Sequence, residues 1–363
     1  MISFLIVVVF IGAGGAFLHQ AKFGHSPSGE RLKRIERSPN FRNGNFQNQL
    51  PTPMMKEGIS IFGVAKDFLF DRSSRSTPPS VLPTVKTNLF ELNRHDDVVV
   101  WFGHSSYFMQ IDGKRFLVDP VLCGSASPVP ITTRSFAGTD AYTPADIPEI
   151  DYLLITHDHW DHLDHETLMQ LKPKINTIVT GLGVGEHLEA WGFDPVCIIE
   201  KDWNESADLG NGVTITATPA RHFSGRGLTR NNTLWVSMVL KTPHQSIFLS
   251  GDGGYGPHFE TIGRMYGPFD LALIECGQYN ESWKYIHMKP EETVQAARDL
   301  QARKFIPIHW SKFILSLHAW DESIVRVTKE AERLNIPILH PMIGQSVRMN
   351  HTEATPMWWE AVR

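Results

Sequence analysis

Cysteine is scarce in this chain of 363 residues. Its three cysteines, at positions 123, 197 and 276, are an odd number and form no CxxC pair. This spacing predicts neither a disulfide framework nor a cysteine-rich zinc site. The 17 histidines are therefore the side chains to follow, because histidine is the commonest metal ligand in proteins.

A surplus of positive charge is also missing. The chain has 34 Lys and Arg against 39 Asp and Glu, a net charge of -5. Residues 1–57 carry seven basic and three acidic side chains, net +4, which leaves -9 for the remainder. No basic stretch is interleaved with aromatic residues, so we expect no nucleic-acid partner.

Repeats and low-complexity arrays are absent as well. With 42% hydrophobic and 20% charged residues, the composition excludes a disordered tail, a fibrous repeat and a disulfide-stapled miniprotein. The length permits one or two domains, and we favour one domain with a long N-terminal extension. We divide the chain into an apolar anchor, an extended arm, a main domain and a C-terminal tail: residues 1–21, 22–83, 84–350 and 351–363.

One long uncharged run stands at the N-terminus, from Ile2 to Leu18. Its length is at the lower limit for a membrane span. A secretory signal usually has Lys or Arg before its apolar run, and here none precedes it. We favour an uncleaved anchor, with a cleaved signal and a buried core helix as the alternatives. The basic residues that follow the run place the bulk of the chain on the cytoplasmic side of a membrane.

The arm is rich in Pro, Asn, Ser, Gly and Arg, which predicts an extended wrap rather than a packed domain. Its phenylalanines are expected to pin it onto a neighbouring surface: Phe41, Phe46, Phe62, Phe68 and Phe70.

From Asp97 onward the pattern changes to short apolar runs separated by turns. A turn at Asp112-Gly113 joins the first two expected strands. Further strands are expected at Tyr152–Thr156, Thr177–Thr180, Val213–Thr218, Leu234–Lys241, Ser246–Leu249, Leu271–Glu275 and Phe305–Ile308. Helices are expected at His165–Leu171, Val184–Trp191, Pro290–Arg303 and Glu322–Leu334. This order predicts an α/β layered sandwich.

The most informative segment follows the strand that ends near Thr156. It contains His157, His159, Asp161 and His162 in the pattern HxHxDH. Three imidazoles and a carboxylate within six residues are not typical of an apolar core or of a solvated face. Nitrogen and oxygen donors of this kind suit zinc without any thiolate, so the motif predicts a metal site.

Three further strands end in a candidate donor. His222, Asp252 and His309 each come just after an apolar strand, at positions where loops gather along one rim of a sheet. A lone histidine after a strand is usually structural, but three such residues together with HxHxDH support a larger metal centre.

These motifs resemble the metallo-β-lactamase superfamily, whose fold is an αββα sandwich with a binuclear metal site. The narrower likeness is to the N-acylphosphatidylethanolamine-hydrolysing phospholipase D group and its bacterial relatives. It covers about Asp97 to Val347. The residues that carry it are VVWFGHSSYFMQIDGKRFLVDPV, THDHWDHLD, ATPARHFSGR, FLSGDGGYGPHF, YIHMKPEE and FIPIHW.

The resemblance implies two divalent ions, with Zn²⁺ as the expected metal. It gives His157, His159 and His222 to the first ion, Asp161, His162 and His309 to the second, and Asp252 to both. Trp160 stands where the phospholipase D group often has Tyr, and we expect it in the wall of the substrate cleft. Asp119 and Asp164 are expected to orient histidine ligands, while His104 is assigned no definite role.

The implied reaction is attack on a phosphodiester by a hydroxide that the two ions hold. Asp161, Asp252 and His287 are the expected catalytic residues: Asp161 orients the hydroxide, Asp252 fixes the spacing of the ions, and His287 assists the leaving oxygen. The expected substrate is an N-acylphosphatidylethanolamine-like phospholipid, cleaved to an N-acylethanolamine and phosphatidic acid. The expected partners are then the phospholipid and, through the N-terminal segment, a membrane. A homodimer is left as a further possibility.

Other functions remain open at this point. A lactonase on the same fold would use the same hydroxide on a carbonyl carbon, and it would need no apolar anchor. A nuclease is disfavoured by the acidic balance. A membrane-tethered binding protein with a structural metal site is disfavoured because structural zinc sites generally close with four ligands.

Overall fold

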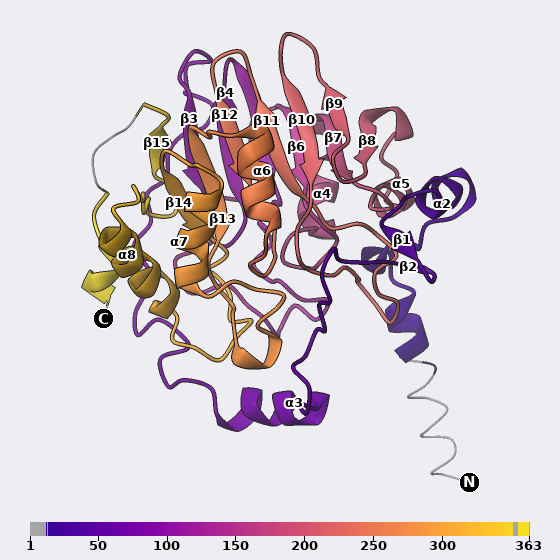
Figure 1. Ribbon diagram of the computed structural model, residues 1–363, viewed down its shortest axis with the longest axis horizontal. Helices are drawn as coiled ribbons and strands as arrows, with labels where there is room; N and C mark the ends of the chain where they lie inside the picture. Colours follow the sequence, from indigo (N-terminus) through magenta and orange to yellow (C-terminus); the bar gives the residue numbers. More distant parts are fainter. Residues whose placement is uncertain (1–11, 13, 351–354, 363) are drawn as a thin grey trace.

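The computed structural model describes residues 12, 14–350 and 355–362, and it forms two sheets packed face to face with helices on both outer sides (Figure 1). The seven-stranded sheet has the order β15, β3, β4, β5, β6, β7, β8. Its strands are Ser346–Arg348, Val98–Trp101, Tyr107–Ile111, Lys114–Val118, Ile150–Ile155, Ile175–Gly181 and Ile198–Lys201. The six-stranded sheet has the order β14, β13, β12, β11, β10, β9. Its strands are Phe305–Ile308, Leu271–Glu275, Ser246–Leu249, Ser237–Lys241, Thr214–Thr218 and Ser206–Asp208.

Two helices cover the outer face of the seven-stranded sheet, and three cover the six-stranded sheet (Figure 1). The first pair is α4 (His165–Leu171) and α5 (Gly185–Ala190). The other three are α6 (His258–Tyr266), α7 (Pro290–Asp299) and α8 (Glu322–Leu334). Short 3₁₀ turns lie at Ala21–Phe23, Pro144–Asp146, Lys172–Lys174, Pro195–Cys197, Glu281–Trp283 and Trp358–Val362. The predicted α/β sandwich is therefore confirmed.

Strand β6 shows how the sequence builds these layers. Alternate strand residues point to opposite faces, and Leu154 packs into the core between the sheets while Leu153 and Ile155 pack under α4 and α5. All three are fully buried. A strand buried on both faces reads as a continuous apolar run, which explains why the sequence located β6 and its neighbours well.

Turn and cap residues set where the elements begin and end. Asp112 and Gly113 form the predicted turn between β4 and β5, both with positive φ, as tight hairpins require. The Asp164 carboxylate accepts hydrogen bonds from the backbone of Glu166 and Thr167, so it caps the N-terminus of α4. The sequence predicts that Asp164 orients a histidine ligand, and this prediction is wrong, because the carboxylate caps α4 instead.

The arm contains more local structure than an extended wrap. Helix α2 (Gly29–Glu36), a small hairpin of β1 (Phe41–Arg42) and β2 (Asn45–Phe46), and helix α3 (Ile61–Phe70) interrupt it. Phe46 is buried in the core as expected, whereas Phe62 and Phe70 are exposed. These two side chains do not pin the arm to the main domain.

Among the residues that the structure describes, we find no helix with the length and apolar character that crossing a membrane requires. Most of the predicted anchor, residues 1–11 and 13, lies outside the described residues.

Candidate metal centre

The HxHxDH motif occupies the loop between β6 and α4, and Asp119 holds this loop in place. Asp119 follows β5 directly and accepts hydrogen bonds from the backbone N–H and the hydroxyl of Thr156, at 2.9 and 2.6 Å. It also accepts a hydrogen bond from Nδ1 of His162 at 2.7 Å. This contact directs Nε2 of His162 away from Asp119, into the site. The expected orienting role of Asp119 agrees with this geometry.

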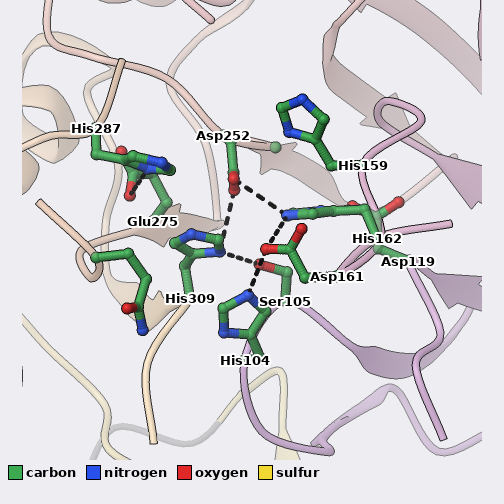
Figure 2. Close-up of polar contacts among 12 residues, drawn as sticks. His104, Ser105, Asp119, His159, Asp161, His162, Asp252, Glu275, His287 and His309 are labelled. Atoms are coloured by element: carbon green, nitrogen blue, oxygen red, sulfur yellow. Dashed lines mark hydrogen bonds and ion pairs between the residues drawn. The ribbon is translucent and has the colours of Figure 1, made fainter. Parts of the chain in front are cut away.

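The remaining predicted donors come from the facing sheet. His222 follows β10, Asp252 follows β12 and His309 follows β14. These three strands run in the same direction, so their carboxyl ends meet at one edge. All seven predicted donors, four from the motif and three from the second sheet, converge at this edge. Figure 2 shows five of them: His159, Asp161, His162, Asp252 and His309.

Two groups of donor atoms lie on either side of Asp252. His157, His159 and His222 form one group, and Asp161, His162 and His309 form the other together with His104. Within each group the donor atoms lie within 4.8 Å of one another. The Oδ2 atom of Asp252 is 3.2 Å from Nε2 of His162 and 3.8 Å from Nε2 of His222. Asp252 therefore faces both groups, as a bridging ligand would.

Tight backbone geometry presents Asp252 and His309. Gly251 has a φ of +59°, and a Cβ there would lie 2.7 Å from the carbonyl oxygen of Val236, so no other residue fits without movement. His309 and His104 also have positive φ, and the N–H of His309 donates to the carbonyl of His104 at 2.9 Å. Such conformations in non-glycine residues store strain and cluster at functional sites.

The protonation states suit a metal. Burial lowers the pKa of His157, His222 and His309 well below its ordinary value. Burial would raise the pKa of Asp252, but the nearby His162 and His309 outweigh it and keep the pKa well below its usual range. His162 differs from these histidines, because Asp252, Asp161 and Asp119 outweigh its burial and raise its pKa well above the ordinary value. A cation bound there would displace that proton, since imidazoles bind metals in the neutral form.

Unpaired atoms provide a further test of fit. Among the described residues, Nε2 of His309 is buried without a hydrogen-bond partner. Nε2 of His162 and Oδ1 of Asp252 are also buried and have ion-pair contacts alone, at 3.2 Å to Oδ2 of Asp252 and at 3.1 Å to Nδ1 of His309. Buried polar atoms without partners are costly. A cation held among these donors would satisfy them, so the residues present fit a metal centre.

The structure gives His104 a definite role, which the sequence did not. Its Nε2 lies 2.9 Å from Oδ2 of Asp161 (Figure 2), and the side chain is fully buried. This contact fixes the Asp161 carboxylate. Ser105, which the sequence analysis did not single out, makes a similar contact with Nδ1 of His309 at 2.9 Å.

His287 lies beside the centre, with its ring stacked on that of His309 at 5.1 Å. Its Nδ1 is 3.5 Å from Oε2 of Glu275, a fully buried carboxylate whose pKa burial raises to about 7. The pKa of His287 is raised, because its contact with Glu275 outweighs burial. Glu275 was missed as a site residue; the available signal was a carboxylate at the end of an apolar strand.

The arm supplies another contact that the sequence did not reveal. The amide of Asn48 donates to the carbonyl oxygen of His222 at 2.7 Å and accepts from the N–H of the same residue at 3.1 Å. It also accepts from the indole N–H of Trp235. One side chain of the arm therefore fixes the backbone of a predicted ligand.

A cavity of about 330 Å³ opens above the donors. His159, Asp161, His222, Asp252, His287 and His309 contribute to its polar part, and among the described residues Arg230 adds a guanidinium to the lining. Its apolar walls are Met54, Met55, Val64, Phe68, Phe223, Trp283, Ile286 and Leu315. Trp160, expected in the cleft wall, instead contacts Phe23 and lies under the guanidinium of Arg226.

Comparison with known proteins agrees with this geometry. A family model described as a beta-lactamase superfamily domain matches residues 114–310, a range that contains all seven donors. The chain belongs to the metallo-β-lactamase superfamily. It is a metallo-β-lactamase-fold hydrolase with a His/Asp cluster that can hold metal.

Within this superfamily, the chain is 37% identical to an uncharacterized protein of Mycobacterium tuberculosis over 328 residues, 89% of this chain and 88% of that protein. It is 33% identical to N-acyl-phosphatidylethanolamine-hydrolyzing phospholipase D 1 of Caenorhabditis elegans over 231 residues, 59% of this chain and 63% of the relative. A solved metallo hydrolase from Ignicoccus hospitalis superposes with a TM-score of 0.54 at 20% identity, covering 70% of this chain and 99% of that one. The last likeness shows the fold alone.

Proposed function

We propose that this metallo-β-lactamase-fold protein is a phosphodiesterase of phospholipase D type. Its substrate would be an N-acylphosphatidylethanolamine-like phospholipid, and its products an N-acylethanolamine and phosphatidic acid. The observation that carries the proposal is a seven-donor cluster at the base of a cavity with apolar walls. The named phospholipase D relative supports it. The proposal includes attachment to a membrane through residues 1–21, with the main domain on the cytoplasmic side.

The seven donors fit two divalent ions, for which we propose Zn²⁺. His157, His159 and His222 would hold one, Asp161, His162 and His309 the other, and Asp252 both. Bound there, the ions would supply Lewis-acid charge to the phosphodiester and lower the pKa of a water molecule.

Three side chains of the protein would carry out the other steps of the hydrolysis. Asp161, whose pKa stays well below its usual range because its histidine neighbours outweigh burial, would accept a hydrogen bond from the attacking water. His104 would keep the carboxylate in that orientation. The oxygen of the water bonds to phosphorus while one proton of the water passes to the Asp161 carboxylate, and the bond from phosphorus to the ethanolamine oxygen breaks. His287, with its raised pKa, would donate a proton to the departing oxygen.

The test is turnover by the purified full chain on matched panels of phosphodiester lipids and lactones, each with and without a chelator. We expect the lipid diesters to be cleaved and the chelator to abolish cleavage. Cleavage of the lactones with none of the diesters would overturn the phosphodiesterase proposal and favour a lactonase. Removing residues 1–21 and following the protein between membrane and soluble fractions tests the attachment separately.

A further inference from the structure

Helix α3 has apolar side chains on two opposite sides. Phe62 and Phe70 are 88% and 75% exposed, and Lys66 lies between them in the sequence and is also exposed. Residues four positions apart share one face of a helix, so these three form a single outward face. Val64 and Phe68, on the other side, line the cavity above the metal donors.

The inward side of α3 roofs the cavity. The ring of Phe68 stacks on Trp283 at 6.1 Å with an interplanar angle of 14°, and Trp283 itself lines the cavity. The outward face therefore lies directly across a single helix from the candidate active site. Figure 1 shows α3 below the two sheets, outside the layers of the sandwich.

Two other apolar features lie on this side or at the cavity rim. The described helical residues 14–18, which end the uncharged N-terminal run, emerge below the sheets on the same side as α3 (Figure 1). Leu228 is 87% exposed, in the loop that leads to the cavity residue Arg230. Exposed apolar surface of this kind marks an interaction site where it is contiguous, as it is for Phe62 and Phe70 on one face of α3.

We propose that the outward face of α3, formed by Phe62, Lys66 and Phe70, rests on a lipid surface. Interfacial helices place aromatic side chains at the boundary between headgroups and acyl chains, with basic residues among the headgroups. Lys66 lies between the aromatic side chains, and the neighbouring Arg72 is exposed.

A second copy of the chain fits this face less well. A two-fold axis through the middle of α3 would bring Lys66 against its own equivalent, and like charges in contact disfavour association. The patch of two aromatic side chains and a lysine is also small beside the 1,200–2,000 Å² or so that a stable protein interface buries.

Contact with lipid at α3 would place the cavity mouth next to the surface that supplies the substrate. This consequence rests on the proposed function, but the contact itself does not. It can therefore be measured without turnover.

The experiment uses the full chain bound to vesicles made of phosphatidylcholine and phosphatidylglycerol in a three-to-one ratio. The accessible cysteines, Cys123 and Cys197, are first replaced by serine, while the buried Cys276 is kept. A polarity-sensitive fluorophore is then attached to a single new cysteine in F62C, F70C or V196C, and nitroxide-labelled lipid is the quencher. Val196 is the matched control because it is 82% exposed but lies in a 3₁₀ turn away from α3.

We expect nitroxide lipid to quench labels at positions 62 and 70 by about half or more, since interfacial side chains enter the headgroup and acyl boundary, and to leave position 196 unquenched. Anchoring through residues 1–18 alone would leave all three labels unquenched, which would overturn the proposal. Equal quenching at all three positions would mean unspecific adsorption and would overturn it too. A dimer in solution that F62S/F70S abolishes, without quenching at 62 or 70, would assign the face to a second copy instead.

Failure of the phosphodiesterase proposal is distinguishable from each of these results. Quenching reports where α3 lies whether or not any diester is cleaved. A thermal unfolding curve for each labelled variant shows whether the label has disturbed the fold.

Discussion

Asp161 combines two roles in the candidate centre, because it is both a donor in one metal group and the carboxylate that His104 orients. We predict that Asp161→Asn lowers kcat by at least about a hundredfold while the protein stays folded, since an amide neither balances the cation charge nor accepts a proton. Turnover, metal content and thermal unfolding are measured together. Asp194→Asn, at an exposed position, is the control. A variant with near-normal turnover would remove Asp161 from the mechanism.

Asn48 affects the candidate metal centre indirectly, through the backbone of His222. Replacing it by alanine leaves both backbone groups of His222 without their side-chain partner. We predict a metal affinity about 10- to 100-fold lower, the usual effect of losing a group that orients a ligand. Competition with a coloured chelator measures it. Thr52→Ala is the matched control, because Thr52 contacts Arg221 and not His222. Equal affinities for N48A and the parent protein would show that the contact is only structural.

Helix α2 contacts the main domain through the buried Ile35, through Arg34 and, with the largest set of ion pairs, through Arg31. Arg31 forms ion pairs with Glu186, Glu189 and Glu200, and Glu200 is nearly buried. We predict that Arg31→Met lowers the free energy of unfolding by about 3 kcal/mol, because it leaves a buried carboxylate without its cation.

Urea unfolding measures this loss, with Lys33→Met as the control. Lys33 pairs with Glu30 on the same helix, and both side chains are largely exposed. Exposed pairs of this kind contribute well under about 1 kcal/mol. If the two variants lost the same free energy, the cluster around Arg31 would not hold α2 to the main domain.

His340, in the segment before β15, makes the free energy of unfolding depend on pH. Burial lowers the pKa of His340 to about 4, while an unfolded histidine titrates near 6.5. Below about pH 6.5 the unfolded chain takes up a proton that the folded chain refuses. The free energy of unfolding should therefore fall between about pH 6.5 and 4, by up to about 3 kcal/mol from this residue.

Unfolding of His340→Gln at pH 7 and pH 5 checks this sign. The variant should lose less stability on acidification than the parent protein does. His95→Gln, at an exposed position, should behave like the parent. If the variant lost as much free energy of unfolding between pH 7 and pH 5 as the parent does, His340 would not contribute to the pH dependence of stability.

At the scale of the whole molecule, the candidate donors connect the two sheets. Four follow β6 of one sheet, and His222, Asp252 and His309 follow strands of the other. A cation bound by both sets stabilises only the folded state, so adding Zn²⁺ to chelator-treated protein should raise Tm. At a concentration of 100 Kd the gain is about 2.7 kcal/mol. Calorimetry with and without chelator measures this gain. A Tm that does not change when metal is added would argue against the assigned donors.

Sequence reasoning located most of the sandwich because its strands are buried. The expected strands at Ser246–Leu249, Leu271–Glu275 and Phe305–Ile308 match β12, β13 and β14 residue for residue, and α4 and α8 also begin and end as expected. Continuous apolar runs between turn residues mark such strands without any tertiary information.

The sequence located some site residues and missed others for a related reason. His157 and its neighbours share one short motif, whereas Asn48 contacts His222 across 174 positions, so no local pattern connects them. The sequence did not reveal α6 because a Gly-Pro pair flanks each of its ends, and it did not reveal α3 because that helix lies in the arm rich in Pro, Asn, Ser, Gly and Arg. Their apolar faces form contacts that only the folded chain provides.

The order of the donors along the chain has a consequence for synthesis. A ribosome produces His157 first and His309 last, 309 − 157 = 152 positions later. Until His309 has emerged, one donor group lacks a member, and Asn48 has no partner before His222 exists. Long-range contacts of this kind form late in folding. Binding of metal by the full set of donors is therefore expected only after His309 has left the ribosome.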